Sequence, residues 1–396
     1  MNLSPNYVKQ KFHIDWTLTI IMAALFTVSM VSIYLAMPLV SNVRGLIEKQ
    51  VLWYITGFMI VGFLIYLGTN NLYQITPILY WILMGALVLL FLDRFINVPF
   101  VSEINGARAW FLFPGIGSFQ PSEFMKIVLI LMSADIVSEH NKAKVEDSYA
   151  EDISLFLKIF KIAIPPLVLI VLQPDTGIPL VIVISIMVMV FVSGIQRSWI
   201  YISMGTFIAV FAIFLYIYFN HQQFLLNLFD SNSLRLSRFF GWLEPEKYMR
   251  SWGNQLYEGL LALGSGGIDG HPLRQVLVLF AEPQNDFIFA VIGQNFGFIG
   301  TSFVVILSCL FDLKVLSIAF NSTDQRNKLM AMGMLGMIVF QQVENMGMIT
   351  GLLPITGITL PFISYGGSSL WSYMIPLSII FKMASDNIQK NGTFFV

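Results

Sequence analysis

The chain has 396 residues, of which 56% are hydrophobic and only 11% are charged. Soluble domains carry about a quarter of charged residues, so this composition excludes a soluble globule and predicts a polytopic membrane protein. A formal net charge of −1 gives no basis for nucleic-acid binding. The single cysteine, Cys309, excludes an intramolecular disulfide and argues against a metal site built from thiolates.

Ten apolar runs approach the length of about 20 residues that a helix needs to cross a bilayer. They lie at roughly 16–37, 51–68, 74–92, 121–139, 155–173, 177–194, 198–219, 287–311, 327–350 and 362–384. Only a turn-forming sequence at 173–177 separates the fifth run from the sixth, so one re-entrant pair is an alternative to two spans. We therefore expect an all-α polytopic fold of about ten transmembrane helices, forming a single integral membrane domain over 1–396.

The distribution of Lys and Arg in the short loops predicts the orientation, because cytoplasmic loops carry the excess. With both termini cytoplasmic, the short outer loops hold only Arg44, Lys49, Arg94 and Arg108. The extracellular loops then lie at about 93–120 and 220–285, the long one between helices 7 and 8, and a cytoplasmic loop lies at about 140–154. A loop as long as 220–285 rarely lacks structure of its own, so we expect short helices on the membrane surface there.

Charged side chains inside the spans are candidates for function, because each costs at least roughly 2.5–3.5 kcal/mol at mid-bilayer. Glu123 and Lys126 stand three residues apart in the fourth run, a spacing that allows helical neighbours to pair. A structural ion pair and a substrate-facing role are equally weighted interpretations. A polar stripe late in the ninth run includes Glu344 and Asn345, and hydrogen bonding between helices is the preferred interpretation there.

Residues 349–369 contain two prolines and four glycines in an apolar context. These residues break a helix at membrane depth, where non-helical backbone is tolerated only if protein buries it or it lines a watery cavity. We favour a cavity lining over a simple kink, with the hydroxyls of Ser364 and Ser368 as substrate contacts.

Two further features belong to turns. Asp175 lies between Pro174 and Thr176, where an Asx turn or a helix cap explains it about as well as catalysis does. The glycine-rich segment 264–270 lacks the strand–helix context of a phosphate loop, so it is weak evidence for nucleotide binding. The four histidines show no metal-ligand spacing.

Asp286 lies where the long outer loop ends and the eighth apolar run begins. A carboxylate at that junction is expected to cap the helix, and the same position presents it to chemistry at the membrane surface. A helix N-terminus lowers the pKa of a carboxyl group, whereas desolvation raises it, and the two effects oppose each other here.

Seven segments together resemble the SEDS family (shape, elongation, division and sporulation), which includes RodA and FtsW. They occur in the family's order at 105–110 (Asn-Gly-Ala-Arg-Ala-Trp), 120–126, 173–177, 264–267, 282 with 286–289 (Asp-Phe-Ile-Phe), 296–300 and 351–369. Residues 284–285 are Gln-Asn where many members have His-Thr, and Pro283 follows Glu282 instead of preceding it. The sequence Ile-Asp-Trp at 14–16, at the start of the first apolar run, and the chain length look more like RodA than FtsW.

The resemblance implies a peptidoglycan glycosyltransferase of the bacterial plasma membrane that polymerises lipid II, with its active site on the outer face. It implies that Asp286 is the required acid and that other motif positions bind substrate, namely Arg108, Trp110, Glu123, Lys126 and Glu282. It also implies a class B penicillin-binding protein as partner, with other membrane proteins of the elongation complex.

The reaction needs a base for the acceptor hydroxyl and positive charge for the departing pyrophosphate. We expect Asp286 to take the proton. Arg108, Arg235 and Arg238 are candidates for the pyrophosphate oxygens, since a guanidinium binds them in a bidentate fashion. A divalent cation, Mg²⁺ or Mn²⁺, is a candidate to share that work, although the sequence offers no ligand set for it. A lipid flippase or other transporter, a division-type polymerase and a docking scaffold are the competing interpretations.

Overall fold

The computed structural model describes residues 12–40, 45–96, 98–104, 107–113, 117–175, 177–228, 234–251, 253–275 and 277–391. Ten long helices fall close to the ten predicted runs. They are α1 (Trp16–Ala36), α2 (Leu46–Leu67), α3 (Thr69–Leu92), α4 (Pro121–Ala143), α5 (Tyr149–Leu172), α6 (Gly177–Val192), α7 (Arg197–Asn220), α11 (Ile288–Asn321), α12 (Gln325–Ile349) and α13 (Gly367–Asn391). The short helix η1 (Met37–Leu39) continues α1. The fifth and sixth runs form two separate helices.

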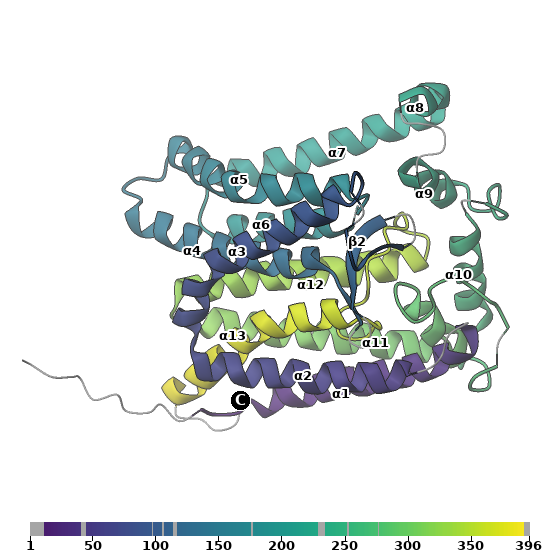
Figure 1. The fold of residues 1–396 in the computed structure, drawn as a ribbon, viewed down its shortest axis with the longest axis horizontal. Coiled ribbons are helices and arrows are strands. Elements are labelled where there is room, and N and C mark those ends of the chain that lie inside the picture. Colours follow the sequence, from purple (N-terminus) through teal and green to yellow (C-terminus); the bar gives the residue numbers. More distant parts are fainter. Residues whose placement is uncertain are drawn as a thin grey trace, which may run out of the picture.

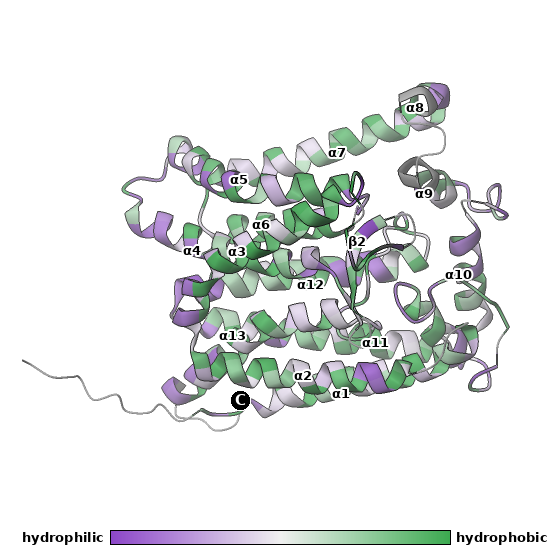
Figure 2. Ribbon diagram, viewed as in Figure 1, coloured by the Kyte–Doolittle hydropathy of each residue, from purple (hydrophilic) through white to green (hydrophobic). Residues whose placement is uncertain are grey.

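The bundle places its polar helices at the centre and its apolar helices at the edge. Six described helices are long and apolar enough to cross a membrane: α1 continued by η1, α2, α3, α5, α7 and α11. The more polar α4 and α12 are mostly buried and pack against each other and α6. At the edge, α7 buries only Tyr218. Lipid therefore meets apolar side chains while the costly polar groups lie inside protein, as in an integral membrane protein (Figure 2).

A three-stranded antiparallel sheet occupies the loop after α3, which the sequence did not predict. It comprises β1 (Val101–Ile104), β2 (Ala107–Phe113) and β3 (Gly117–Phe119), in the order β1-β2-β3. Phe111 is opposite Val101 on one side and Phe119 on the other. These apolar cross-strand pairs stabilise a sheet that is too short to show periodicity in the sequence.

The predicted short helices in the long loop are present. They are α8 (Gln222–Leu228), α9 (Leu234–Leu243) and α10 (Asn254–Ser265). Figure 1 shows them at the same end of the bundle as β2, opposite the α4–α5 connection. The long loop and the loop after α3 thus gather at one end of the molecule.

The glycine-rich segment after α10 packs on a kink in α11. Gly297 has φ 59° and ψ −151°, which interrupts the helix. The N–H groups of Phe298 and Ile299 donate to the carbonyls of Gly267 (2.9 Å) and Ile268 (3.2 Å). A Cβ added at Gly266 would lie 2.1 Å from the Gly293 carbonyl oxygen. Close backbone packing therefore explains Gly266, and also Gly270, whose added Cβ would lie 2.3 Å from the Asn295 carbonyl oxygen.

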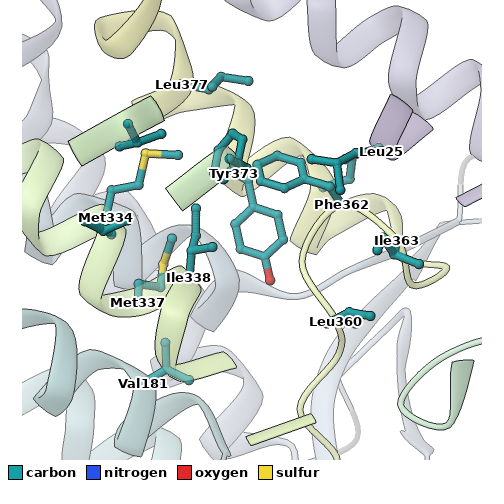
Figure 3. Packing of buried hydrophobic residues seen from close by; sticks show 14 of the residues in the cluster. Leu25, Val181, Met334, Met337, Ile338, Leu360, Phe362, Ile363, Tyr373 and Leu377 are labelled. Atoms are coloured by element: carbon teal, nitrogen blue, oxygen red, sulfur yellow. The ribbon is translucent and has the colours of Figure 1, made fainter. Parts of the chain in front are cut away.

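Residues 350–366 are not helical and fill the centre of the bundle between α12 and α13. Leu360, Phe362 and Ile363 are buried among side chains of α1, α12 and α13 (Figure 3). Their carbonyls are satisfied from the first two helices: Ser29 Oγ donates to the Ile363 oxygen at 2.8 Å, and the Tyr54 hydroxyl donates to that of Phe362. Protein thus buries the broken backbone, as membrane depth requires.

Candidate functional site

Asp286 lies one residue before Phe287, which is the N-cap of α11 and receives no side-chain cap bond. The expectation that Asp286 caps this helix is therefore wrong. Residues 283–287 form a turn, in which the Phe287 N–H donates to the Glu282 carbonyl at 3.3 Å. The carboxylate lies beside the broken segment, since a Cβ added at Gly357 would be 3.7 Å from Asp286 Oδ2.

The surroundings of Asp286 favour its protonated form. The pKa of this carboxyl is raised to about 7, chiefly by burial and in part by the nearby Glu282 charge. A bond from its own backbone N–H and the positive charge of Arg238 lower the pKa. Desolvation is the larger effect, so the opposition left open by the sequence is decided in favour of a raised pKa.

Arg238 joins α9 to this site. Its Nη1 donates to the Thr356 carbonyl at 3.1 Å. Burial lowers the pKa of the Arg238 guanidinium, and the charges of Asp286 and Asp175 raise it. One partly buried cation therefore lies within electrostatic reach of two aspartates that come from different parts of the chain.

Asp175 makes the helix-capping bond that the sequence allowed. Its Oδ1 accepts from the Ile178 N–H at 3.2 Å in the first turn of α6, and its Oδ2 accepts from Gln120 Nε2 at 3.0 Å. The pKa of Asp175 is raised to about 6, chiefly by burial and in part by the Glu123 charge, while Arg238 acts to lower it. The residue thus supports the start of α6 while its carboxyl faces the site.

Glu282 stabilises the turn that carries Asp286. Its Oε2 accepts from Asn285 Nδ2 at 2.6 Å and from Gln284 Nε2 at 3.2 Å. Its φ of 52° is uncommon for a residue other than glycine, and such backbone persists where the surrounding contacts hold it.

Glu123 and Lys126 form a buried salt bridge within α4, on the side of the helix that faces α13. Ser372 Oγ donates to Glu123 Oε2 at 3.3 Å, and Lys126 Nζ lies 4.5 Å from the centre of the Tyr373 ring. The pair lies close enough to the site for the Glu123 charge to act on Asp175.

The two predicted serines hold backbone groups. Ser364 Oγ donates to the Asn285 carbonyl at 2.6 Å and accepts from the Leu360 N–H at 2.9 Å. Ser368 Oγ accepts from the Gln120 N–H at 3.1 Å and donates to the Ser118 carbonyl at 3.0 Å. They link the broken segment to the Asp286 turn and to the end of the sheet.

Arg108 belongs to a neighbouring cavity rather than to the immediate surroundings of Asp286. Its Nη1 lies 3.1 Å from Asp93 Oδ2 and its Nε lies 3.3 Å from Glu103 Oε2. The cavity has a volume of about 250 Å³ and is lined by Leu90, Phe91, Arg94, Glu103, Arg108, Leu172, Gln173 and Pro174. Pro174 immediately precedes Asp175, so the cavity adjoins the site through one turn.

Two predicted residues add little to this geometry. Trp110 lies on β2, where it pairs with Ser102 and is partly buried. Arg235 lies in α9, but its side chain is outside the described residues.

The described residues do not fit a divalent cation held by protein alone. Among them, no group of three or more His, Cys, Asp or Glu side chains gathers at any point. Asp175 and Asp286 instead share the charge of Arg238. We therefore derive no step through a metal ion.

Three residues that position the site were not among the predicted site residues. Asn345 Nδ2 donates to the carbonyls of Asp286 (2.7 Å) and Ile358 (2.8 Å). Gln120 bonds Asp175, and Thr356 accepts from Arg238. The polar stripe late in α12 was the only signal, and it correctly indicated hydrogen bonding but could not name the partners.

Comparison with known proteins identifies the family. The model of the FtsW, RodA and SpoVE family, described as "Cell cycle protein", matches residues 10–389. The chain belongs to this family, the SEDS family. This SEDS protein is 34% identical over 302 residues to the probable peptidoglycan glycosyltransferase FtsW of Haemophilus influenzae, covering 73% of this chain and 70% of that protein.

Two solved structures resemble this SEDS protein over nearly its whole length. One comes from a study of the structural coordination of polymerization and crosslinking by a peptidoglycan synthase complex, with a TM-score of 0.68, 28% identity and coverage of 95% of this chain and 99% of that chain. The other is the rod shape determining protein RodA of Thermus thermophilus, with a TM-score of 0.63, 26% identity and coverage of 96% and 98%.

Proposed function

We propose that this SEDS protein is a peptidoglycan glycosyltransferase that polymerises lipid II into glycan strands, with Asp286 as general base. One observation carries the proposal: the Asp286 carboxyl is buried beside Gly357 of the broken segment and near the charge of Arg238, and burial raises its pKa to about 7. A base works best when its pKa is near the operating pH, and perturbed groups cluster at functional sites. The family relatives named as glycosyltransferases support the reaction class.

The chemistry joins two sugars. The Asp286 carboxylate removes the proton from the 4-hydroxyl of the acceptor, and that oxygen attacks the anomeric carbon of the donor. The bond from this carbon to the pyrophosphate oxygen breaks, and the lipid pyrophosphate leaves with the electron pair. General-base catalysis of this kind contributes about 10²–10⁴-fold.

Positive charge for the leaving pyrophosphate comes from arginines in this proposal. The charge of Arg238 acts on Asp286. Its Nη1 already donates to the Thr356 carbonyl, and this bond orients the planar guanidinium. Arg108 and Arg94 line the adjoining cavity, whose volume of about 250 Å³ admits a phosphate group.

The proposal extends to setting and partner. We place the site on the outer face of a bacterial plasma membrane, with both termini cytoplasmic, and assign the enzyme to elongation and cell shape; a division-type role is the alternative. A solved relative comes from a synthase complex that couples polymerization to crosslinking. We therefore propose a class B penicillin-binding protein as partner, with other elongation-complex membrane proteins.

The decisive experiment measures polymerisation of lipid II by detergent-purified protein, alone and with its co-purified transpeptidase. Asp286→Asn keeps the size of the side chain and removes the base, so we expect the rate to fall by at least about a hundredfold in both settings. Glu246→Gln is the matched control, since it removes an exposed carboxylate from the same long loop, and it should retain the parent rate.

Glycan product in detergent excludes pure transport, because no second compartment exists there. Polymerisation by Asp286→Asn at the parent rate would overturn the assignment of the base. A parent protein that makes no glycan under either condition would favour the flippase or the scaffold.

A further inference from the structure

The backbone that carries Asp286 is held at three successive carbonyls. The Gln284 carbonyl accepts from the Tyr365 N–H at 2.9 Å. The Asn285 carbonyl accepts from Ser364 Oγ at 2.6 Å, and the Asp286 carbonyl accepts from Asn345 Nδ2 at 2.7 Å. No bond of a regular helix or sheet makes these contacts, so side chains and the broken segment fix the turn.

Asn345 makes the contact that unites these parts. It is fully buried on α12, and its amide nitrogen donates to the Ile358 carbonyl (2.8 Å) as well as to that of Asp286. Both partners are acceptors only, so they determine which end of the amide faces them. One side chain thus ties α12 to the turn before α11 and to the broken segment that Arg238 also binds.

We propose that Asn345, assisted by Ser364, is a positioning residue that holds the Asp286 carboxyl in its desolvated place between Gly357 and Arg238. This inference rests on the proposed role of Asp286 as base. Neither residue reaches the substrate in this proposal. Ser364, expected from the sequence to contact substrate, acts through the Asn285 carbonyl instead.

The charges around Asp286 come from several elements. Glu282 lies on its own turn and Arg238 on α9, Asp175 faces Arg238 from the α5–α6 turn, and Glu344 adjoins Asn345 on α12. The bond to the Asp286 carbonyl comes from the uncharged amide of Asn345. Loss of the amide therefore leaves these charges in the chain but lets the turn shift, so that water reaches the carboxyl and its pKa falls toward the ordinary value.

The test compares Asn345→Leu, which keeps the branched shape and the number of heavy atoms, with Asn387→Leu. Asn387 Nδ2 also ties two helices through a carbonyl, that of Ile318 at 3.0 Å, at the cytoplasmic ends of α13 and α11 in the proposed topology. For Asn345→Leu we expect kcat for lipid II polymerisation to fall about thirtyfold with KM within about twofold, since small misplacements cost up to about a hundredfold. Its acid limb in the pH–rate profile should move down by about one pH unit.

The control separates positioning from stability. Asn387→Leu should keep the parent acid limb whatever its effect on melting temperature. If Asn345→Leu does not fold, Ser364→Ala, which removes a single hydroxyl, carries the test and should shift the limb in the same direction. If the folded variants keep the acid limb of the parent and Asp286→Asn is inactive, the positioning role of Asn345 is overturned. The role of Asp286 as general base is then unaffected. Activity of Asp286→Asn at the parent rate would instead overturn the assignment of Asp286 as general base.

Discussion

At the scale of single residues, burial and a neighbouring guanidinium act on the Asp286 carboxyl in opposite directions. Burial prevails and raises the pKa to about 7, whereas Arg238 limits the increase. A carboxylate of ordinary pKa, about 3.9, is always charged at neutral pH but is a weak base. The position in a turn before α11, rather than at its cap, gives Asp286 this property.

The raised pKa predicts the pH dependence of polymerisation. Only the deprotonated carboxyl accepts a proton, so kcat/KM of the parent should rise with pH and level off above about pH 7. A profile measured from pH 5 to 9 in one mixed buffer checks this, and a limb near pH 4 would contradict it.

The folded state also binds this proton more tightly than the unfolded state, so the stability that Asp286 contributes falls as pH rises from about 4 to about 7. Asp286→Asn should therefore be at least as stable as the parent at pH 8.

At the scale of elements, two non-helical segments decide how the helices meet. Residues 350–366 offer backbone carbonyls to α9 and α12 and a backbone N–H to the Asp286 turn, and residues 264–270 press against the kink of α11. In both places backbone approaches backbone closely, which helices with full side chains do not permit. Glycine and proline in these segments therefore determine packing as well as local conformation.

The kink at Gly297 should be intolerant of any side chain. Its φ and ψ are accessible essentially to glycine alone, and an added Cβ would lie 2.5 Å from the Ile268 carbonyl oxygen. We expect Gly297→Ala to cost about 1–3 kcal/mol from backbone strain alone and to lower the melting temperature by on the order of 5 °C. Gly205→Ala in α7 is the control, because its Cβ would meet no atom within 4 Å. Equal melting temperatures for the two variants would contradict the packing described.

At the scale of the whole molecule, the arrangement reverses the pattern of a soluble protein. Polar α4 and α12 lie inside and apolar α7 lies at the edge, so the fold is suited to a lipid surround. The sheet, α8, α9 and α10 gather at one end of the bundle (Figure 1). The site therefore belongs to the end that the distribution of Lys and Arg assigns to the outer face.

Cysteine labelling tests this orientation. In a Cys309→Ser background, Glu246→Cys in the long loop should react with a membrane-impermeant maleimide on intact cells. Asp147→Cys, at a side chain that is 83% exposed in the α4–α5 connection, should react only after the membrane is opened. The reverse pattern would place the site in the cytoplasm and remove the lipid II proposal.

The sequence by itself determined the membrane class, the ten long helices among the described residues and the short helices of the long loop, and its resemblance to the SEDS family predicts the role of Asp286. Hydrophobic periodicity, proline and glycine affect structure over a few residues, so a single sequence is enough to predict their effects. It missed the sheet, whose strands are too short to show periodicity, and it wrongly made Asp286 a helix cap.

Only the tertiary structure decided what surrounds Asp286. Asn345 lies 59 residues from Asp286 in the chain, Gln120 lies 55 from Asp175, and Arg238 lies 118 from Thr356. Contacts across such separations leave no local pattern. The direction of the Asp286 pKa shift is likewise set by the packing of distant segments, because desolvation depends on what covers the carboxyl and not on its neighbours in the chain.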